Sequence, residues 1–394
     1  MKPTTKNSPR VYLAQRKARP IWAGHPWIYS GAITRKEGKP ETGSIVEVCD
    51  HKGVVIGVGS FNATARIAVR MLGPSLPDGG VEALIKERIL TAQEKRRGLG
   101  LPSEHTTAYR LINGAGDGLP GVFCDILGDL ASVEVTTAAA ESWIPILLKM
   151  LKNPSICVRV PDDSARMEGI APGDRLGKGD LEEPIALKEH GIGWTIKAGK
   201  GQKTGFYTDQ RENRALIGEI SAGKRVLDTF CYTGGFALNA AKGGAKQVVG
   251  VDSSGPAVDL AQRTAKSNEL EAEFHHEDVM RYLKALPEAE QFEVMIMDPP
   301  KLARNRHRID DAYKKYRAIN AEGLRRVAPG GFFMSCSCSS LVNDEMFMRL
   351  LTDSAHVAGR RLNLHKMLGP GMDYPTPVAH PEGRYLTVAL CSVS

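Results

Sequence analysis

Apolar and polar positions alternate over short stretches at the start of the chain. Up to residue 74, runs rich in β-branched residues are separated by glycine-containing turns, a pattern typical of strands joined by tight loops. It predicts strands at residues 11–13, 44–48, 54–59 and 67–71. Residues 25–29 are expected to form a loop or a short helix. Because short strands need protected edges, residues 1–74 are expected to form a small β-barrel domain.

Between residues 75 and 190 the pattern mixes helical and strand periods. Apolar positions at helical spacing over residues 81–97, with basic residues before Gly98, predict a helix. We predict strands at residues 121–126, 130–136 and 157–160, and a further helix at residues 138–151. These elements indicate a central α+β domain.

From residue 191 onward, strand and helix patterns alternate. The predicted strands are residues 225–229, 247–251, 273–276, 292–297 and 332–335, and the predicted helices are residues 235–242, 256–268, 279–286 and 312–327. This alternation is typical of an α/β fold with a parallel, doubly wound sheet.

Composition narrows the class of protein only slightly. Of the 394 residues, 42% are hydrophobic and 25% are charged, as in ordinary soluble proteins. The net charge of +7 permits a polyanionic partner without requiring one. The polar N-terminus, the lack of a long apolar stretch and seven scattered cysteines favour a cytoplasmic protein. We expect no membrane association and no bound metal.

A strand, a glycine turn and a helix follow one another over residues 226–236. Asp228 lies in the predicted strand, Gly234 and Gly235 form the turn, and Asp252 follows the next strand. Ligands of open α/β sheets bind at this edge, where an acid after the second strand can accept from ribose hydroxyls. The glycines allow a ligand to approach the backbone closely.

The glycine pattern distinguishes between possible cofactors. A dinucleotide site needs GxGxxG to seat a pyrophosphate, whereas this turn reads FCYTGGF and is preceded by Asp228. A carboxylate repels phosphate but can bind the ammonium of a methionine moiety, which favours S-adenosylmethionine (SAM) over NAD. A glycine turn alone is as often structural as functional, so the prediction depends on its combination with Asp252.

Further residues extend the predicted cofactor site. Asp278 can accept from the adenine amino group or cap the following helix, and the two roles are compatible. Residues 201–211, GQKTGFYTDQR, carry more polar and aromatic groups than a plain linker needs. The predicted cofactor contacts are Phe206, Asp209, Gln210, Asp228, Phe230, Tyr232, Thr233, Gly234, Gly235, Asp252, Asp278 and Asp298.

Two segments at strand ends predict a site for a target base. Asp298 begins a rigid Asp-Pro-Pro-Lys loop, so its carboxylate can accept from an amine or ring N–H of a planar base, and Lys301 adds a cation.

A cysteine thiolate can add to carbon 6 of a pyrimidine, which activates carbon 5 for methylation. Alone, Cys336 and Cys338 are more readily explained as packing residues, but their place after the neighbouring strand favours catalysis. Because Cys338 lies further toward the ligand-binding edge, we predict that it is the nucleophile.

Basic residues follow the Asp-Pro-Pro segment directly. Arg304, Arg306 and Arg308 suit contacts with RNA phosphates, although a solvated basic loop is the alternative. The target base must be unpaired or extruded, because stacking shields its ring carbons.

Several motifs together resemble the family of ribosomal RNA large-subunit methyltransferases of type I. The resembling segments are residues 25–27, 116–121, 201–211, 227–236, 298–301, 335–339 and 380–386, which are spread over nearly the whole chain. The resemblance implies a PUA RNA-binding domain at residues 1–74, a central domain at 75–190 and a Rossmann-like class I SAM-dependent methyltransferase domain at 191–394. It also implies 5-methylcytosine formation in large-subunit ribosomal RNA, and a homodimer. The triplet around Cys338 resembles the Thr-Cys-Ser pattern of the nucleophile in RNA cytosine methyltransferases, with Ser337 in place of Thr.

The sequence also departs from related patterns. Ile126 and Leu127 stand where the family is expected to carry a basic–aromatic pair, which affects central-domain contacts. Lys301 stands where many RNA cytosine methyltransferases have a second cysteine, so the base that removes the carbon-5 proton is not identified. A related catalytic domain methylates guanine at N7. The alternatives are therefore methylation of another RNA base, guanine N7 first, and a non-catalytic RNA-binding assembly factor.

Overall fold

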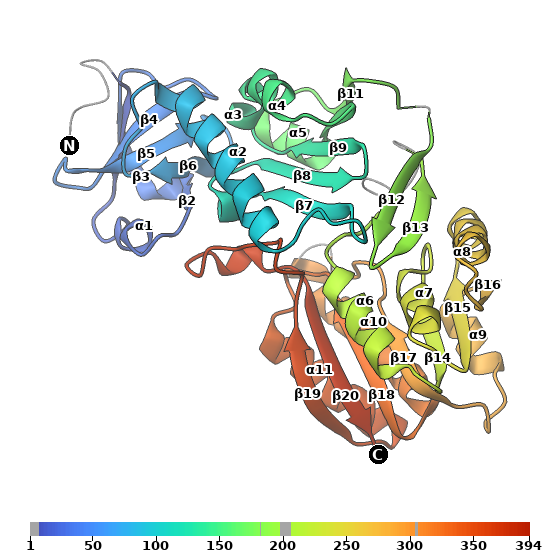
Figure 1. Cartoon of the computed structure of the whole chain (residues 1–394). Coiled ribbons are helices and arrows are strands. Elements are labelled where there is room, and N and C mark those ends of the chain that lie inside the picture. Colours follow the sequence, from blue (N-terminus) through green and yellow to red (C-terminus); the bar gives the residue numbers. More distant parts are fainter. Residues whose placement is uncertain (1–7, 182, 198–205, 304–305) are drawn as a thin grey trace. The chain divides into compact units, whose positions relative to one another are not determined.

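A computed structural model of the chain describes residues 8–181, 183–197, 206–303 and 306–394. The chain forms two compact units, and Figure 1 colours them along the sequence. The first unit contains Met1–Lys188, Thr195–Thr208 and Met372–Gly383, and the second contains Glu189–Trp194, Asp209–Gly371 and Arg384–Ser394. β12 (Ile185–Glu189) and β13 (Ile192–Ile196) span positions where the chain passes between the units.

The N-terminal part of the first unit is a β-sheet with one short helix, α1 (Arg19–Trp22). Its strands pair in the order β2-β6-β5-β4-β1-β3. Their bounds are β1 (Arg10–Leu13), β2 (Trp27–Tyr29), β3 (Ile33–Glu37), β4 (Ile45–Cys49), β5 (Val55–Phe61) and β6 (Ile67–Gly73). The four predicted strands are confirmed. The loop or helix predicted for residues 25–29 is wrong, because Trp27–Tyr29 pairs with β6, and such a short strand shows too little alternation to be recognised.

The rest of the first unit combines helices with a second sheet. Its strands pair in the order β11-β10-β9-β8-β7. The bounds are β7 (Ala108–Asn113), β8 (Val122–Leu127), β9 (Leu130–Val135), β10 (Ser155–Val160), β11 (Gly173–Lys178), α2 (Gly80–Gly98), α3 (Ala138–Ser142), α4 (Ile144–Met150) and α5 (Asp162–Glu168). The single helix predicted at residues 138–151 is wrong, because Trp143 separates α3 from α4. Pro145 lacks a backbone N–H and therefore suits the first turn of α4.

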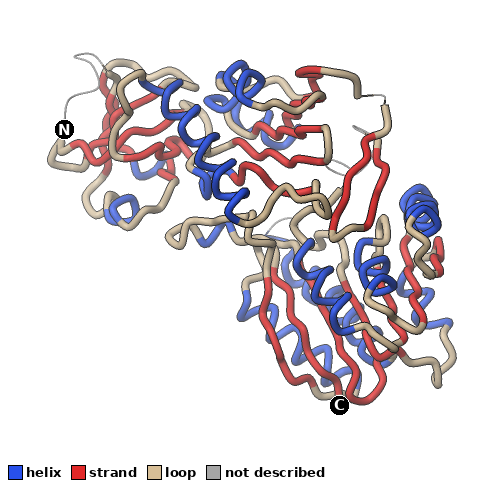
Figure 2. Tube along the Cα trace, in the orientation of Figure 1, coloured by secondary structure: helices blue, strands red, loops and turns tan. Residues whose placement is uncertain are grey.

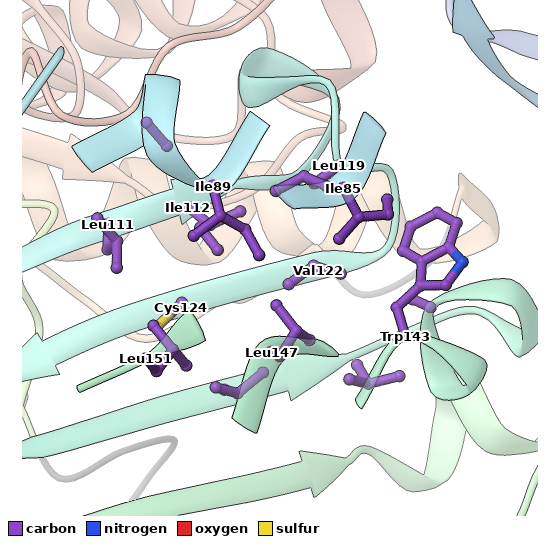
Figure 3. Packing of buried hydrophobic residues seen from close by; sticks show 14 of the residues in the cluster. Ile85, Ile89, Leu111, Ile112, Leu119, Val122, Cys124, Trp143, Leu147 and Leu151 are labelled. Atoms are coloured by element: carbon purple, nitrogen blue, oxygen red, sulfur yellow. The ribbon is translucent and has the colours of Figure 1, made fainter. Parts of the chain in front are cut away.

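The first unit contains two buried hydrophobic clusters, one within the N-terminal sheet and a larger one centred on α2 and the second sheet. Ile85 and Ile89 of α2 are fully buried against residues of the second sheet, among them Ile112 (Figure 3). Val58 and Leu72 of the N-terminal sheet belong to the same buried cluster. The two sheets therefore share apolar packing, which explains why they form one compact unit.

The second unit is a mixed sheet with helices, which Figure 2 shows as red strands and blue helices. Its strands pair in the order β16-β15-β14-β17-β18-β20-β19. The strand bounds are β14 (Arg225–Thr229), β15 (Gln247–Asp252), β16 (Glu273–His276), β17 (Phe292–Met297), β18 (Val327–Ser337), β19 (Leu362–Leu368) and β20 (Thr387–Val393). The helices are α6 (Arg211–Ile220), α7 (Gly235–Lys242), α8 (Gly255–Ser267), α9 (Val279–Ala285), α10 (Ile309–Arg325) and α11 (Asp344–Ala358).

The alternating pattern is confirmed from β14 to β18, where neighbouring strands are parallel. The prediction of a wholly parallel sheet is wrong at the edge formed by β20 and β19, because β20 runs antiparallel to both β18 and β19. β18 also begins earlier than predicted. Gly330 has a φ of 79° inside this strand, and the pairing with β17 shifts register near it, so Gly330 lies at an irregularity within β18. In the described ranges, no helix is long and apolar enough to span a membrane.

Candidate cofactor and target-base site

The predicted site residues of the second unit lie at one edge of its sheet. Asp252 ends β15, and Asp298 directly follows β17. Thr229, the last residue of β14, pairs with Met297, the last residue of β17. Met297 in turn pairs with Ser335 of β18. The carboxyl ends of four neighbouring strands therefore meet, as ligand sites in open α/β sheets require.

The turn between β14 and α7 has an unusual backbone. Phe230 and Tyr232 have φ values of 59° and 49°, which residues other than glycine rarely adopt. Gly234 has a φ of 80°. Asp252 stabilises this turn, because its Oδ2 accepts a hydrogen bond from the Tyr232 N–H at 2.9 Å. Gly235 is needed for space, because a Cβ there would lie 2.8 Å from the Arg214 side chain. Strain held this way is typical of ligand sites.

Asp228 is a fully buried carboxylate within this edge. Its Oδ2 accepts from the Ala237 N–H at 2.9 Å, whereas its Oδ1 has no hydrogen-bond partner among the described residues. Burial raises the pKa of Asp228 well above its ordinary value, and the charges of Asp298 and Asp252 raise it further. A cationic ligand is what such a group of carboxylates requires. The sulfonium and ammonium groups of SAM fit this requirement.

Asp252 and Asp278 both accept hydrogen bonds from backbone N–H groups, but in different structural roles. The Asp252 Oδ1 accepts from the Ser254 N–H at 2.8 Å, yet a carboxylate has about four acceptor positions, so both oxygens can also accept from hydroxyls. Asp278 is exposed and accepts from the Arg281 N–H at 2.9 Å as the cap of α9. The capping role is therefore confirmed, and the contact with adenine stays a prediction.

The segment before α6 places two polar side chains in the second unit. The Asp209 carboxylate accepts from the Tyr385 hydroxyl at 2.7 Å, and Gln210 donates to Asp298 at 3.0 Å. Phe206 is buried and belongs to the first unit. Residues 201–205 of the same motif lie outside the described residues. Sequence reasoning missed Tyr385, although it lies in the resembling segment at residues 380–386.

The two candidate cysteines differ in depth. Cys336 lies within β18 and is fully buried, and burial raises the pKa of its thiol well above the ordinary value. Cys338 lies beyond the last residue of β18 and is half-buried. All seven cysteines lie in the described ranges, and the other six are buried. Cys338 is therefore the thiol that a ligand can reach most easily.

Asn320 and Tyr316 of α10 support the end of β18. The Ser335 hydroxyl donates to Asn320 at 2.6 Å, and the Ser337 hydroxyl donates to the Tyr316 hydroxyl at 3.4 Å. Sequence reasoning missed both residues, because a buried polar residue on a helix has no recognisable local pattern.

The predicted RNA-binding loop is only partly described. Lys301 is exposed, and Arg308 immediately precedes α10. Arg304 lies outside the described residues, and the structure describes Arg306 only as the first residue of a short 3₁₀ helix. Their contacts with RNA stay a prediction.

A pocket of about 420 Å³ lies on the N-terminal sheet of the first unit. Arg35 lies over the Tyr12 ring, with its guanidinium carbon 3.7 Å from the ring centroid. His51 and Lys52 also line the pocket, and Arg35 is ion-paired with Glu37 at 2.7 Å. Sequence reasoning missed this basic pocket, because its members come from separate strands and turns.

The strand order and the cluster of carboxylates at the carboxyl edge define a SAM-dependent methyltransferase. A family model described as S-adenosylmethionine-dependent methyltransferase matches residues 173–370, and one described as a PUA-like domain matches residues 11–74. The predicted fold class and SAM cofactor are thereby confirmed.

Curated relatives match along the whole chain. The ribosomal RNA large subunit methyltransferase I of Salmonella arizonae is 34% identical over 399 residues, covering 99% of both chains. The protein of the same name from Salmonella typhi is 34% identical and covers 98% of each chain. The chain belongs to this family of methyltransferases.

Solved structures share the fold. SMU.776, crystallised in complex with SAH, has a TM-score of 0.83 at 19% identity and covers 97% of this chain and 99% of its own. The SAM-dependent methyltransferase from Agrobacterium tumefaciens has a TM-score of 0.51 at 19% identity, covering 74% of this chain and 90% of its own.

Proposed function

We propose that the chain methylates large-subunit ribosomal RNA and forms 5-methylcytosine through a covalent adduct with Cys338. Relatives that match over the full length carry the name ribosomal RNA large subunit methyltransferase I, which supports the class of substrate. The observation that carries the chemistry is the half-buried Cys338 thiol at the end of β18, next to the strand that Asp298 follows.

SAM, when bound, supplies a methyl group activated by its sulfonium charge. Asp228 is the residue proposed to accept from the ammonium group through its Oδ1, which has no partner in the described part of the chain. Asp252 is proposed to accept from the ribose hydroxyls, and Asp278 from the adenine amino group. Asp209, Phe230, Tyr232, Thr233, Gly234 and Gly235 of the second unit are proposed to complete the contacts, and the contact of Phe206 with SAM stays a prediction.

The target base is proposed to lie between Asp298 and Cys338. The Asp298 carboxylate accepts from the exocyclic amine of cytosine and orients the ring, while Lys301 provides a nearby cation. The Cys338 thiolate forms a bond to carbon 6, and the electron pair of the 5,6 double bond becomes available at carbon 5 for methylation. Loss of the carbon-5 proton to a base then restores the double bond and releases the thiolate.

RNA is proposed to contact both the basic loop and the N-terminal module. Arg304, Arg306 and Arg308, which follow the Asp-Pro-Pro segment in the sequence, are proposed to bind phosphates. In the PUA-like module, the guanidinium of Arg35 offers a flat surface on which an unpaired base can stack, and Lys52 offers a charge for phosphate. The domain boundaries at residues 74/75 and 190/191, the homodimer and the cytoplasmic location stay predictions.

Trapping with 5-azacytosine tests the covalent mechanism. RNA that carries this base at the target position retains the thiol adduct, because proton elimination is blocked. The wild type and Cys336→Ala should form an RNA–protein complex that survives denaturation, and Cys338→Ala should not. The reverse pattern would move the role to Cys336.

A second measurement distinguishes the bases. Mass spectrometry of methylated nucleosides should detect 5-methylcytosine. If both cysteine variants methylate at the wild-type rate, the covalent mechanism is wrong, and guanine N7 becomes the better assignment. Binding of RNA and SAM without methyl transfer would instead support the non-catalytic assembly factor.

A further inference from the structure

Gln210 is a buried amide that connects the start of α6 to the target-base edge of the sheet. Gln210 is only 5% exposed and occupies the N-cap position of α6. The Nε2 group donates to Asp298 Oδ2 at 3.0 Å, and Oε1 accepts from Asn213 Nδ2 at 2.6 Å. Both ends of the amide are therefore engaged inside the second unit.

The partners of Asn213 fix the orientation of the Gln210 amide. Asn213 Nδ2 also donates to the carbonyl oxygen of Gly369 at 3.0 Å, so the group facing Gln210 is an NH₂ and not an oxygen. An NH₂ group needs an acceptor, which places Oε1 of Gln210 toward Asn213. The NH₂ group of Gln210 then faces Asp298, where a carboxylate requires a donor.

The same amide acts on the neighbouring strand. Burial raises the pKa of the Cys336 thiol and the charge of Asp298 adds to this, while a hydrogen bond from Gln210 opposes both effects. Gln210 therefore interacts with residues at the ends of both β17 and β18. Asp298 directly follows β17, and Cys338 directly follows β18.

We propose that Gln210 is a positioning residue for the target base and not a cofactor contact. This inference rests on the proposed function, because it assigns Gln210 to the side of the site where Asp298 receives the base. The fixed NH₂ group holds the Asp298 carboxylate in one orientation. A carboxylate has about four acceptor positions in all, so it can accept from more than one donor. The Gln210 amide directs its NH₂ group at Asp298 and its oxygen at Asn213, so these partners and not SAM set its orientation.

Two substitutions separate positioning from cofactor binding. Gln210→Ala removes the donor, and we expect kcat for RNA methylation to fall on the order of 10²-fold because the base is no longer aligned. SAM affinity, measured by calorimetry, should stay within about twofold of the wild type, well below the tenfold step that one lost contact can cause. Gln210→Glu preserves the shape but replaces the donor with a second carboxylate beside Asp298.

The pH dependence of Gln210→Glu gives a readout that a merely structural role would not affect. Two carboxylates this close do not both ionise readily, so the acidic limb of the kcat profile should move to higher pH. Gln247→Glu is the matched control, because Gln247 is exposed and its Oε1 accepts from Arg225, a role that a carboxylate preserves. The control should keep the wild-type rate and profile.

The outcomes distinguish this inference from the proposed function. An active wild type with Gln210 variants that lose SAM affinity but keep kcat and the pH profile would overturn the positioning role alone. A uniform loss of rate in Gln210→Glu, with an unmoved acidic limb, would overturn it too. A wild type that transfers no methyl group to ribosomal RNA would overturn the proposed function, and this inference with it.

Discussion

Asp228 illustrates, at the scale of single residues, how a binding site can oppose folding. Its carboxylate is fully buried with one oxygen unpartnered among the described residues, and its pKa is raised well above the ordinary value. A raised pKa in the folded state means that folding favours the protonated acid. The contribution of Asp228 to stability is therefore fully present below about pH 4, the ordinary pKa of Asp, and is lost as pH rises through the raised pKa.

Asp228→Asn should stabilise the SAM-free protein while weakening SAM binding. The neutral amide avoids a buried charge, so we expect a gain of about 1–3 kcal/mol in the free energy of unfolding at pH 8. The gain should shrink as pH falls toward about 4. Denaturant unfolding across this range checks the gain, and calorimetry checks the loss of SAM affinity. A gain that does not depend on pH would contradict the assignment of a raised pKa.

Helix α2 illustrates stabilisation at the scale of an element. Its basic end includes Arg96, whose guanidinium makes a bidentate pair with Asp117 at 2.6 and 2.8 Å. The same side chain donates to the carbonyl oxygens of Arg110 and Asp373, at 2.9 and 2.7 Å. Because Arg96 and Asp117 are buried, the pair fixes α2 against the loop after β7 inside the first unit.

Asp117→Ala should cost about 3–5 kcal/mol in the free energy of unfolding, because it leaves the Arg96 charge buried without its partner. The double substitution Arg96→Met and Asp117→Leu should cost less, since it removes both charges. Glu94→Ala is the control: it breaks the exposed pair with Arg97 on the same helix and should change stability by no more than about 0.5 kcal/mol. Urea unfolding measures all three. If the double variant is less stable than Asp117→Ala, the prediction is wrong, and the unpaired Arg96 charge costs less than the loss of both side chains.

Charge acts at the scale of the whole molecule. The chain carries a net charge of +7, but binding of RNA depends on where the cations lie and not on their sum. Two separate groups are proposed to contact phosphate, one in the loop at residues 304–308 and one at the pocket that contains Arg35 and Lys52.

Replacing Arg304, Arg306 and Arg308 by Ala should flatten the salt dependence of RNA affinity. Each lost phosphate contact with single-stranded RNA lowers the slope of log K against log salt by about 0.7. The double substitution Arg35→Ala and Lys52→Ala should lower the slope by a further ~0.7 through the lost Lys52 contact, and should weaken binding at every salt concentration because Arg35 no longer stacks on a base. Arg263→Ala with Lys266→Ala removes two exposed charges from α8 as the matched control. Fluorescence anisotropy over a salt series checks the result, and unchanged slopes in the test variants would exclude these residues from the interface.

Much of this protein was determined by the sequence alone, because the relevant signals are local. The strand–turn–helix order of residues 225–242 and the acids at strand ends, Asp252 and Asp298, follow from short-range periodicity and glycine placement. The carboxyl ends of parallel strands share one edge, so such acids can be assigned to a common site without coordinates.

Only the tertiary structure decided which side chains pair across long separations. Gln210 was predicted as a cofactor contact, and its partner Asp298 lies 88 residues further along the chain. Tyr385 meets Asp209 across 176 residues, and β20 inserts antiparallel beside β18. Such contacts depend on packing between distant segments. A single sequence carries no local pattern for them, whereas periodicity within one element is visible in the sequence itself.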